Sequence, residues 1–159
     1  MAAERSEDRE LVVTREFDAP RELVWEAWTH PQHVAQWWGP NGFTNTIHEM
    51  AVQPGGVWRL TMHGPDGTDY PNKIVFLEVV PPERLVYDHS DDYEDNNTHF
   101  HVTVTFEEQG SGTKLTMRMQ FATAEEWKQT ENEFGATEGA NQTMERLRQY
   151  LATMEVKRV

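Results

Sequence analysis

Two adjacent tryptophans, Trp37 and Trp38, are the residues best suited to hold a ligand, and the chain-breaking pair Gly39-Pro40 follows them at once. Two large aromatic side chains on neighbouring residues cannot share one face of a helix. One tryptophan is therefore expected to anchor in the core, and the other to form a wall of an internal cavity, where an indole ring can stack on a flat ligand. The alternative role for the pair is a plug that holds a short helix against a sheet.

A second group with possible chemistry is the histidine pair His99 and His101, whose spacing places two imidazoles on one face of a strand. Such a pair can bind zinc if a neighbouring strand supplies a third ligand, and His48 or His63 could do so. The face that carries the pair is the polar one, so surface histidines are the better interpretation. We predict no functional metal and no cofactor in this chain.

Acid–base chemistry would need a carboxylate or a histidine in an apolar pocket, where desolvation shifts its pKa. Ser90 is expected in a loop and lacks the motif of a hydrolase nucleophile. The acidic candidates lie in or beside expected strands, and no two of them have a diagnostic spacing: Glu49, Asp69, Glu78 and Asp88. The sequence therefore offers no catalytic group.

Composition excludes several classes of partner. The 159 residues carry a net charge of −13, from 27 acidic and 14 basic side chains, and this surface repels phosphate backbones and anionic membranes. Without cysteine there is no disulfide and no thiolate nucleophile, and no stretch approaches the ~20 apolar residues of a membrane span. We expect a cytoplasmic protein without a nucleic-acid or membrane partner, and an acidic loop at 91–95 that is solvated.

The elements that must position these residues begin with a strand at Glu10 to Phe17, after a loose, charged tail at residues 1–9. Residues 10–159 are expected to form a single domain. Pro20 then starts a first helix, Arg21 to Thr29, and Gly39-Pro40 ends a second, Gln32 to Trp38. A meander of hairpins follows, with strands near Phe43 to Val52, Val57 to His63, Asn72 to Val80, Arg84 to His89, Thr98 to Glu107 and Thr113 to Phe121.

Two patterns indicate where the core lies. The last two strands alternate cleanly between apolar and polar residues, so one face of each is buried. In the closing segment, apolar residues recur at helical spacing from Ala140 to Met154 and predict a long amphipathic helix. Such a helix closes only part of the concave face of a curved antiparallel sheet, and the uncovered part becomes a pocket whose end the short helices plug.

Four ordered motifs connect the chain with a known family: Phe17-Asp18-Ala19-Pro20-Arg21-Glu22-Leu23-Val24-Trp25-Glu26-Ala27-Trp28, Gln36-Trp37-Trp38-Gly39-Pro40, Pro54-Gly55-Gly56-Val57-Trp58-Arg59 and Pro81-Pro82-Glu83-Arg84-Leu85-Val86-Tyr87. They resemble the START-like (SRPBCC) superfamily, and within it the branch named after the activator of heat-shock protein 90 ATPase, over about residues 10–155. This resemblance implies the α+β helix-grip fold of START and Bet v-like proteins. About seven antiparallel strands curve around a long C-terminal helix, and two short helices follow the first strand.

The resemblance leaves function open, because members include hydrophobic-ligand carriers, polyketide-product binders and toxin-resistance proteins. We expect a cavity that binds a small hydrophobic or aromatic molecule. The alternatives are an enzyme acting on an aromatic or polyketide-like compound and a co-chaperone-like stimulator of the heat-shock protein 90 ATPase. Many relatives begin the last helix with Gly-Trp, whereas this chain has Gly139-Ala140 and so lacks a bulky side chain near the expected mouth of the cavity.

The expected ligand-binding residues come from three sources. Strand alternation indicates Phe100, Met117 and Met119, helical spacing indicates Met144, and the family resemblance adds the tryptophan pair and Tyr87. Flexible thioethers among them would suit a pocket that accepts more than one ligand shape. The complete predicted set is Trp37, Trp38, Phe76, Tyr87, Phe100, Met117, Met119 and Met144.

Overall fold

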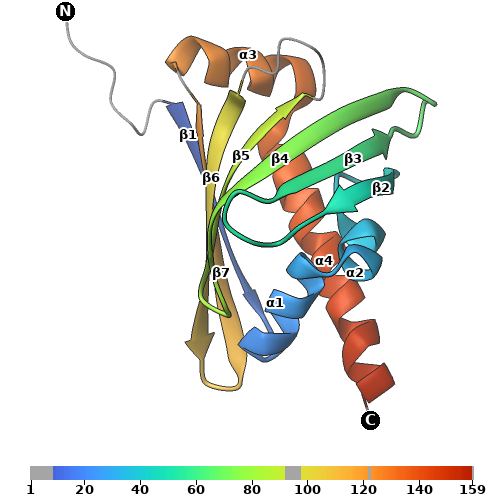
Figure 1. Cartoon of the computed structure of the whole chain (residues 1–159), viewed down its shortest axis with the longest axis vertical. Helices are drawn as coiled ribbons and strands as arrows, with labels where there is room; N and C mark the ends of the chain where they lie inside the picture. Colours follow the sequence, from blue (N-terminus) through green and yellow to red (C-terminus); the bar gives the residue numbers. More distant parts are fainter. Residues whose placement is uncertain (1–8, 92–97, 122, 159) are drawn as a thin grey trace, which may run out of the picture.

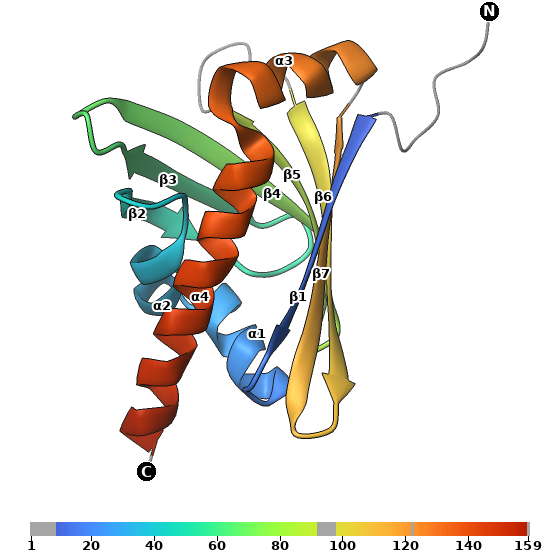
Figure 2. The ribbon, with the colours of Figure 1, turned by 180° about the vertical axis from the view of Figure 1, so that it is seen from behind.

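The computed structural model describes residues 9–91, 98–121 and 123–158 (Figures 1 and 2). One antiparallel sheet holds seven strands in the order β1-β7-β6-β5-β4-β3-β2, so that consecutive strands pair from β2 to β7, and β1 pairs with β7. The strands are β1 (Glu10–Phe17), β2 (Thr44–Met50), β3 (Val57–His63), β4 (Asp69–Val80), β5 (Arg84–Asp91), β6 (Thr98–Gln109) and β7 (Gly112–Phe121). This is the hairpin meander that the sequence predicts.

The helices lie on the concave face and at the ends of the sheet. Two short helices, α1 (Arg21–Thr29) and α2 (Pro31–Trp37), follow β1, while α3 (Ala124–Phe134) and α4 (Ala136–Arg158) follow β7. Helix α4 runs diagonally across the sheet, with α1 and α2 beside its C-terminal half and α3 across the opposite end (Figures 1 and 2). The predicted α+β helix-grip fold, with two short helices after the first strand, is confirmed.

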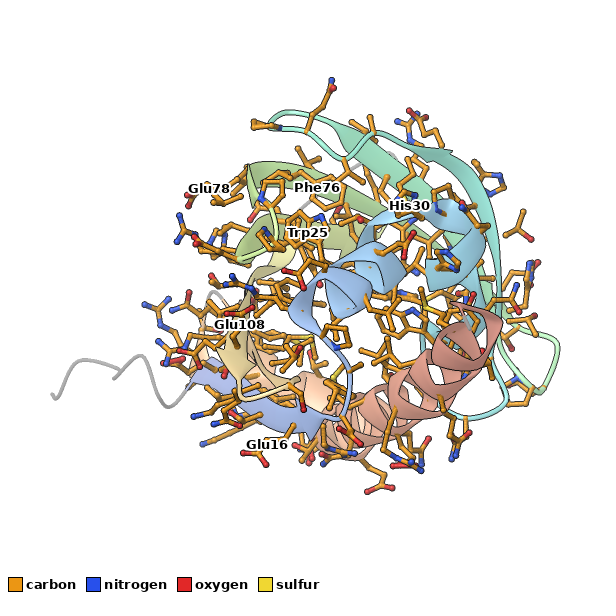
Figure 3. All side chains as sticks on the ribbon, turned by 90° about the horizontal axis from the view of Figure 1, so that it is seen from below. Glu16, Trp25, His30, Phe76, Glu78 and Glu108 are labelled. Atoms are coloured by element: carbon orange, nitrogen blue, oxygen red, sulfur yellow. The ribbon has the colours of Figure 1, made fainter. Side chains whose placement is uncertain are left out.

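Alternation along the strands produces the core. Val102, Val104 and Phe106 in β6 are each no more than 1% exposed, and their polar neighbours face outward. Seen from the end that carries α1, Trp25 and Phe76 lie on the inner side of the sheet, whereas Glu78 and Glu108 point away from it (Figure 3). Helix α4 contributes the matching apolar stripe, in which the most deeply buried residues are Met144, Leu147 and Leu151.

Several boundaries differ from those predicted. Strand β4 begins at Asp69 because that residue still pairs with His63 of β3. Strand β5 continues past His89, so Ser90 is a buried strand residue opposite Lys73 and not the loop residue that we expected. The segment before α4 is the separate helix α3, which Thr123 caps by accepting a hydrogen bond from the Glu126 amide. Residues 1–8 of the predicted tail and 92–95 of the acidic loop lie outside the described residues.

Candidate ligand-binding site

A cavity lies between α4 and the concave face of the sheet, and its inner compartment has a volume of about 220 Å³. The wall is almost entirely apolar, made chiefly of indole, phenyl and thioether groups from α1, the turn after α2, four strands and α4. Six of the residues expected to bind a ligand lie along this compartment: Trp38, Tyr87, Phe100, Met117, Met119 and Met144. The fold therefore brings together residues that are up to 106 positions apart in the sequence.

An outer compartment of about 640 Å³ adjoins the inner one and leads toward solvent between the β3–β4 hairpin and the α3–α4 junction. It is more polar, since Asn72, Ser90 and Gln142 contribute to its wall, and Glu138 is the acidic residue there. Five residues line both compartments, and we call them the collar: Pro40, Met62, His89, Phe100 and Gly139. A ligand that reaches the inner compartment from the outer one passes this collar.

The adjacent tryptophans take different places. Trp37 is fully buried, its indole N–H donates a 3.1 Å hydrogen bond to the carbonyl of Ala27, and its ring packs 5.0 Å from that of Trp28. Trp38 lines the inner compartment and packs edge-on against Trp58 at 4.8 Å. The first indole thus anchors α2 to the core, and the second forms part of the cavity wall.

Two residues of the expected set do not line the cavity. Trp37 is one of them, for the reason just given. Phe76 is the other: it is 1% exposed and lies behind the wall, stacked on Trp58 at 6.4 Å and edge-on to Tyr87 at 6.1 Å. Phe76 therefore packs behind Tyr87, on the side away from the cavity.

The turn between α2 and β2, which carries Trp38, is held by a residue that the sequence analysis missed. Arg146 of α4 donates hydrogen bonds of 2.8 to 3.3 Å to five backbone carbonyls, those of Gln36, Trp38, Gly39, Pro40 and Phe43. These carbonyls include groups left open by the end of α2. Burial lowers the pKa of Arg146, but a guanidinium stays charged in proteins, so all five bonds are charge-assisted.

Glycine is required at the centre of that turn. Gly39 has a φ of +94°, and a Cβ built there would lie 2.9 Å from the methyl carbon of Met62. Both Gly39 and Met62 line the inner compartment. The same turn therefore fixes one side of the collar.

His89 is a collar residue that alternation could have revealed, because it lies two positions after Tyr87 and so on the same face of β5. Its Nε2 lies 2.9 Å from Oδ1 of Asn72. An amide oxygen only accepts hydrogen bonds, so Nε2 carries a proton and donates it. The imidazole also packs against Phe100, with ring centres 4.7 Å apart, and this contact narrows the passage between the compartments.

Tyr87 adds a phenol hydroxyl to the inner compartment. The residue is 2% exposed, and burial raises the pKa of its phenol. Within the described residues its hydroxyl makes no hydrogen bond. A neutral, unpaired phenol in an apolar cavity can donate a hydrogen bond to a ligand.

The carboxylates considered for acid–base chemistry lie elsewhere. All four pair with basic side chains on the solvent side: Glu49 with Arg59, Asp69 with His63, Glu78 with Arg84 and Asp88 with His101. None of them lines either compartment. Their exposure explains why they offer no desolvated acid.

The histidines considered as zinc ligands already contact polar side chains nearby. His101 pairs with Asp88 at 2.9 Å, His63 with Thr46 at 2.7 Å, and His48 with Thr61 at 2.9 Å. The side chain of His99 lies outside the described residues. Among the side chains that the structure describes, no three potential metal ligands cluster together.

A long helix gripped by a curved sheet, with a cavity between them, defines a helix-grip protein. The family model described as "Activator of Hsp90 ATPase homolog 1-like protein" matches residues 18–152. The chain therefore belongs to this family, and the resemblance noted from its motifs is confirmed. No curated protein matches the sequence.

Solved structures share the fold over nearly the whole chain. Protein Ms6760 from Mycobacterium smegmatis is 27% identical, with a TM-score of 0.79 and 91% of each chain covered. A protein from Arthrobacter aurescens, solved by NMR, is also 27% identical, with a TM-score of 0.84 over 95% of this chain and 90% of that one. A third, from Rhodobacter sphaeroides, is 27% identical with a TM-score of 0.79 over 92% and 94% of the two chains. In the described part of the chain, no helix has the length and apolar character needed to cross a membrane.

Proposed function

We propose that this protein binds a small, largely apolar and aromatic molecule in the cavity beneath α4. The observation that carries the proposal is the inner compartment, a largely apolar space of about 220 Å³ that leads through the collar to a more polar outer one. Ligand sites in proteins have this character: an apolar concavity with a few placed polar groups.

The size of the hollow supports this proposal over a purely structural role for its lining. Protein interiors are normally close-packed. A hollow of about 220 Å³ lined by apolar side chains departs from that close packing. A bound apolar molecule would fill it. Burying about 200 Å² of ligand surface contributes roughly 5 kcal/mol before ordering costs, which is compatible with micromolar affinity.

The test is a panel of naphthalene-based and sterol-like compounds, with the melting temperature and tryptophan fluorescence as readouts. We expect at least one flat aromatic compound to raise the melting temperature and to quench fluorescence, because Trp28 and Trp38 line the inner compartment. Mass spectrometry of the native protein as isolated would identify a co-purifying molecule directly. If no compound has either effect, the proposal loses its support.

An enzymatic role has less support from the same site. An efficient general acid or base has a pKa near the working pH. Burial moves the pKa of Tyr87 further from neutrality, and the carboxylates considered above are paired on the solvent side. These observations favour binding over catalysis.

Stimulation of the heat-shock protein 90 ATPase is the role that the family description names. No residue of this chain carries that proposal, so we expect the ATPase rate of the chaperone to stay unchanged when this protein is added. A clear increase in rate would make the co-chaperone role the better one. A cysteine-free chain suits the reducing cytoplasm, where we place this protein.

A further inference from the structure

The inner compartment contains a polar group that makes no hydrogen bond to the described residues and is not sealed off from the cavity by neighbouring atoms. That group is the Tyr87 hydroxyl, on a residue that is 2% exposed and lines the compartment. The indole nitrogens of Trp28 and Trp58 also lack partners, but both are fully enclosed by neighbouring atoms. Buried polar groups are normally hydrogen-bonded, so an unpaired donor beside a cavity points to a partner that enters the cavity.

We infer that the ligand is an aromatic molecule with a neutral hydrogen-bond acceptor, of the ketone or quinone type, and that Tyr87 donates its hydroxyl proton to that oxygen. This inference rests on the proposed function, because it names the chemical class of the same ligand. A cavity of about 150 Å³ holds benzene, so an inner compartment of about 220 Å³ has room for one or two fused rings.

Charge decides that the acceptor is neutral. The inner compartment has no lysine or arginine in its wall, and an unpaired anion in an apolar space is strongly disfavoured. Glu138 stands in the outer compartment, and the whole chain has a net charge of −13, so a carboxylate would also be repelled on its way in. The raised pKa of Tyr87 keeps the phenol protonated, and therefore able to donate, at neutral pH.

The different polarity of the two compartments determines which end of the ligand points inward. The apolar rings fit the thioethers of Met117 and Met144, whereas Asn72 and Gln142 offer amide groups to any second polar substituent in the outer compartment. A ketone at the inner end and a more polar group at the outer end would satisfy both compartments.

Three isosteric probes test the inference: 2-acetylnaphthalene carries the ketone, 2-ethylnaphthalene replaces it by a methylene, and 2-naphthoate replaces it by an anion. Each is titrated into the wild-type protein and into Tyr87→Phe, which keeps the ring and removes the hydroxyl. We expect Tyr87→Phe to weaken binding of 2-acetylnaphthalene about threefold to tenfold, the effect of one neutral hydrogen bond, and to leave 2-ethylnaphthalene unweakened. In the wild type, 2-naphthoate should bind more weakly than the ketone.

Infrared spectroscopy of the bound ketone provides a readout that does not depend on the variant. A hydrogen bond lowers the carbonyl stretching frequency. We therefore expect the carbonyl band of bound 2-acetylnaphthalene to lie at a lower frequency in the wild-type complex than in the Tyr87→Phe complex. If the naphthalenes bind but the band does not shift, or Tyr87→Phe weakens all probes equally, the inference is wrong while the proposed function stands. Tighter binding of 2-naphthoate would overturn the neutral acceptor. Failure of all three probes to bind the wild type would overturn both proposals.

Discussion

The two ends of the concave face are built from similar side chains, yet one end is solid and the other hollow. At the end covered by α1, Trp25 and Trp28 pack edge-on against Phe106, with ring centres 5.4 and 6.1 Å apart, and Trp37 packs against Trp28. We call this group the plug: Trp25, Trp28, Trp37 and Phe106. At the other end, Phe100 and Met119 face the inner compartment.

Side-chain size on α4 accounts for the difference. Where α4 passes the plug, Leu147 and Leu151 fill the space against the sheet and are almost completely buried. One to three turns earlier, the helix presents Gly139, Ala140 and Thr143 to the cavity. Apolar side chains alone therefore do not make a binding site. Small residues on the covering helix are also needed, because they leave the space unfilled.

The largest expected loss of stability comes from a substitution in the plug. Trp37→Ala would leave a cavity in close-packed surroundings and remove the hydrogen bond to Ala27, at a cost of about 3–5 kcal/mol of unfolding free energy. Trp38→Ala, the matched neighbour, should cost less, because one side of that indole already faces a hollow. Urea denaturation measures both. Equal losses would remove the distinction between the two ends.

The next effect concerns the link between α4 and the turn that carries Trp38. Arg146→Ala removes a charged donor from five carbonyls, of which those of Trp38 and Pro40 still accept from Asn45 and from the Phe43 amide, and it should cost about 1.5–3 kcal/mol of unfolding free energy. Arg148→Ala is the control on the same helix, because Arg148 is exposed and pairs only with Glu145 among the described residues. Thermal melts of both variants give the comparison, and an Arg146→Ala melt no lower than that of Arg148→Ala would contradict the role of the turn.

A bulky side chain in the inner compartment should lower the affinity for ligand more than it lowers the stability of the protein. Ala140→Trp places an indole in the inner compartment, so the affinity for a naphthalene probe should fall at least tenfold while the circular dichroism spectrum is retained. Overpacking can itself cost 1–3 kcal/mol, so the melting temperature is measured as well. Ala152→Trp, on the exposed side of α4, is the control and should bind like the wild type. Unchanged binding in Ala140→Trp would place the site elsewhere.

The smallest effect is a pH dependence from Tyr87. Burial raises the pKa of this phenol above the value of about 10 that it has in the unfolded chain. Below pH 10 both states are protonated, and this group adds no pH dependence. Above pH 10 only the unfolded state loses the proton, so stability falls as pH rises. Urea midpoints between pH 9 and 11 should fall more steeply for the wild type than for Tyr87→Phe, in which Tyr150 still titrates. Parallel slopes would contradict a buried phenol.

Local patterns in the sequence predicted most of the fold. Strand alternation located the inward faces of β6 and β7, and helical spacing located the buried stripe of α4, because each depends only on the geometry of one element. The same patterns could not separate Phe76 from Tyr87, since both point inward and only their packing partners decide which one reaches the cavity. Arg146 was missed because its partners lie more than 100 positions earlier in the chain.

The hollow itself is tested most directly by the methionine methyl resonances of the protein under xenon gas. Xenon enters dry apolar cavities without needing any particular ligand chemistry. We predict that xenon shifts the methyl signals of Met62, Met117, Met119 and Met144, which line the inner compartment, and leaves those of Met50 and Met154 unchanged. Absence of shifts at the four lining methionines, or equal shifts at all six, would contradict the claim that this chain keeps a ligand-sized apolar cavity at one end of its sheet.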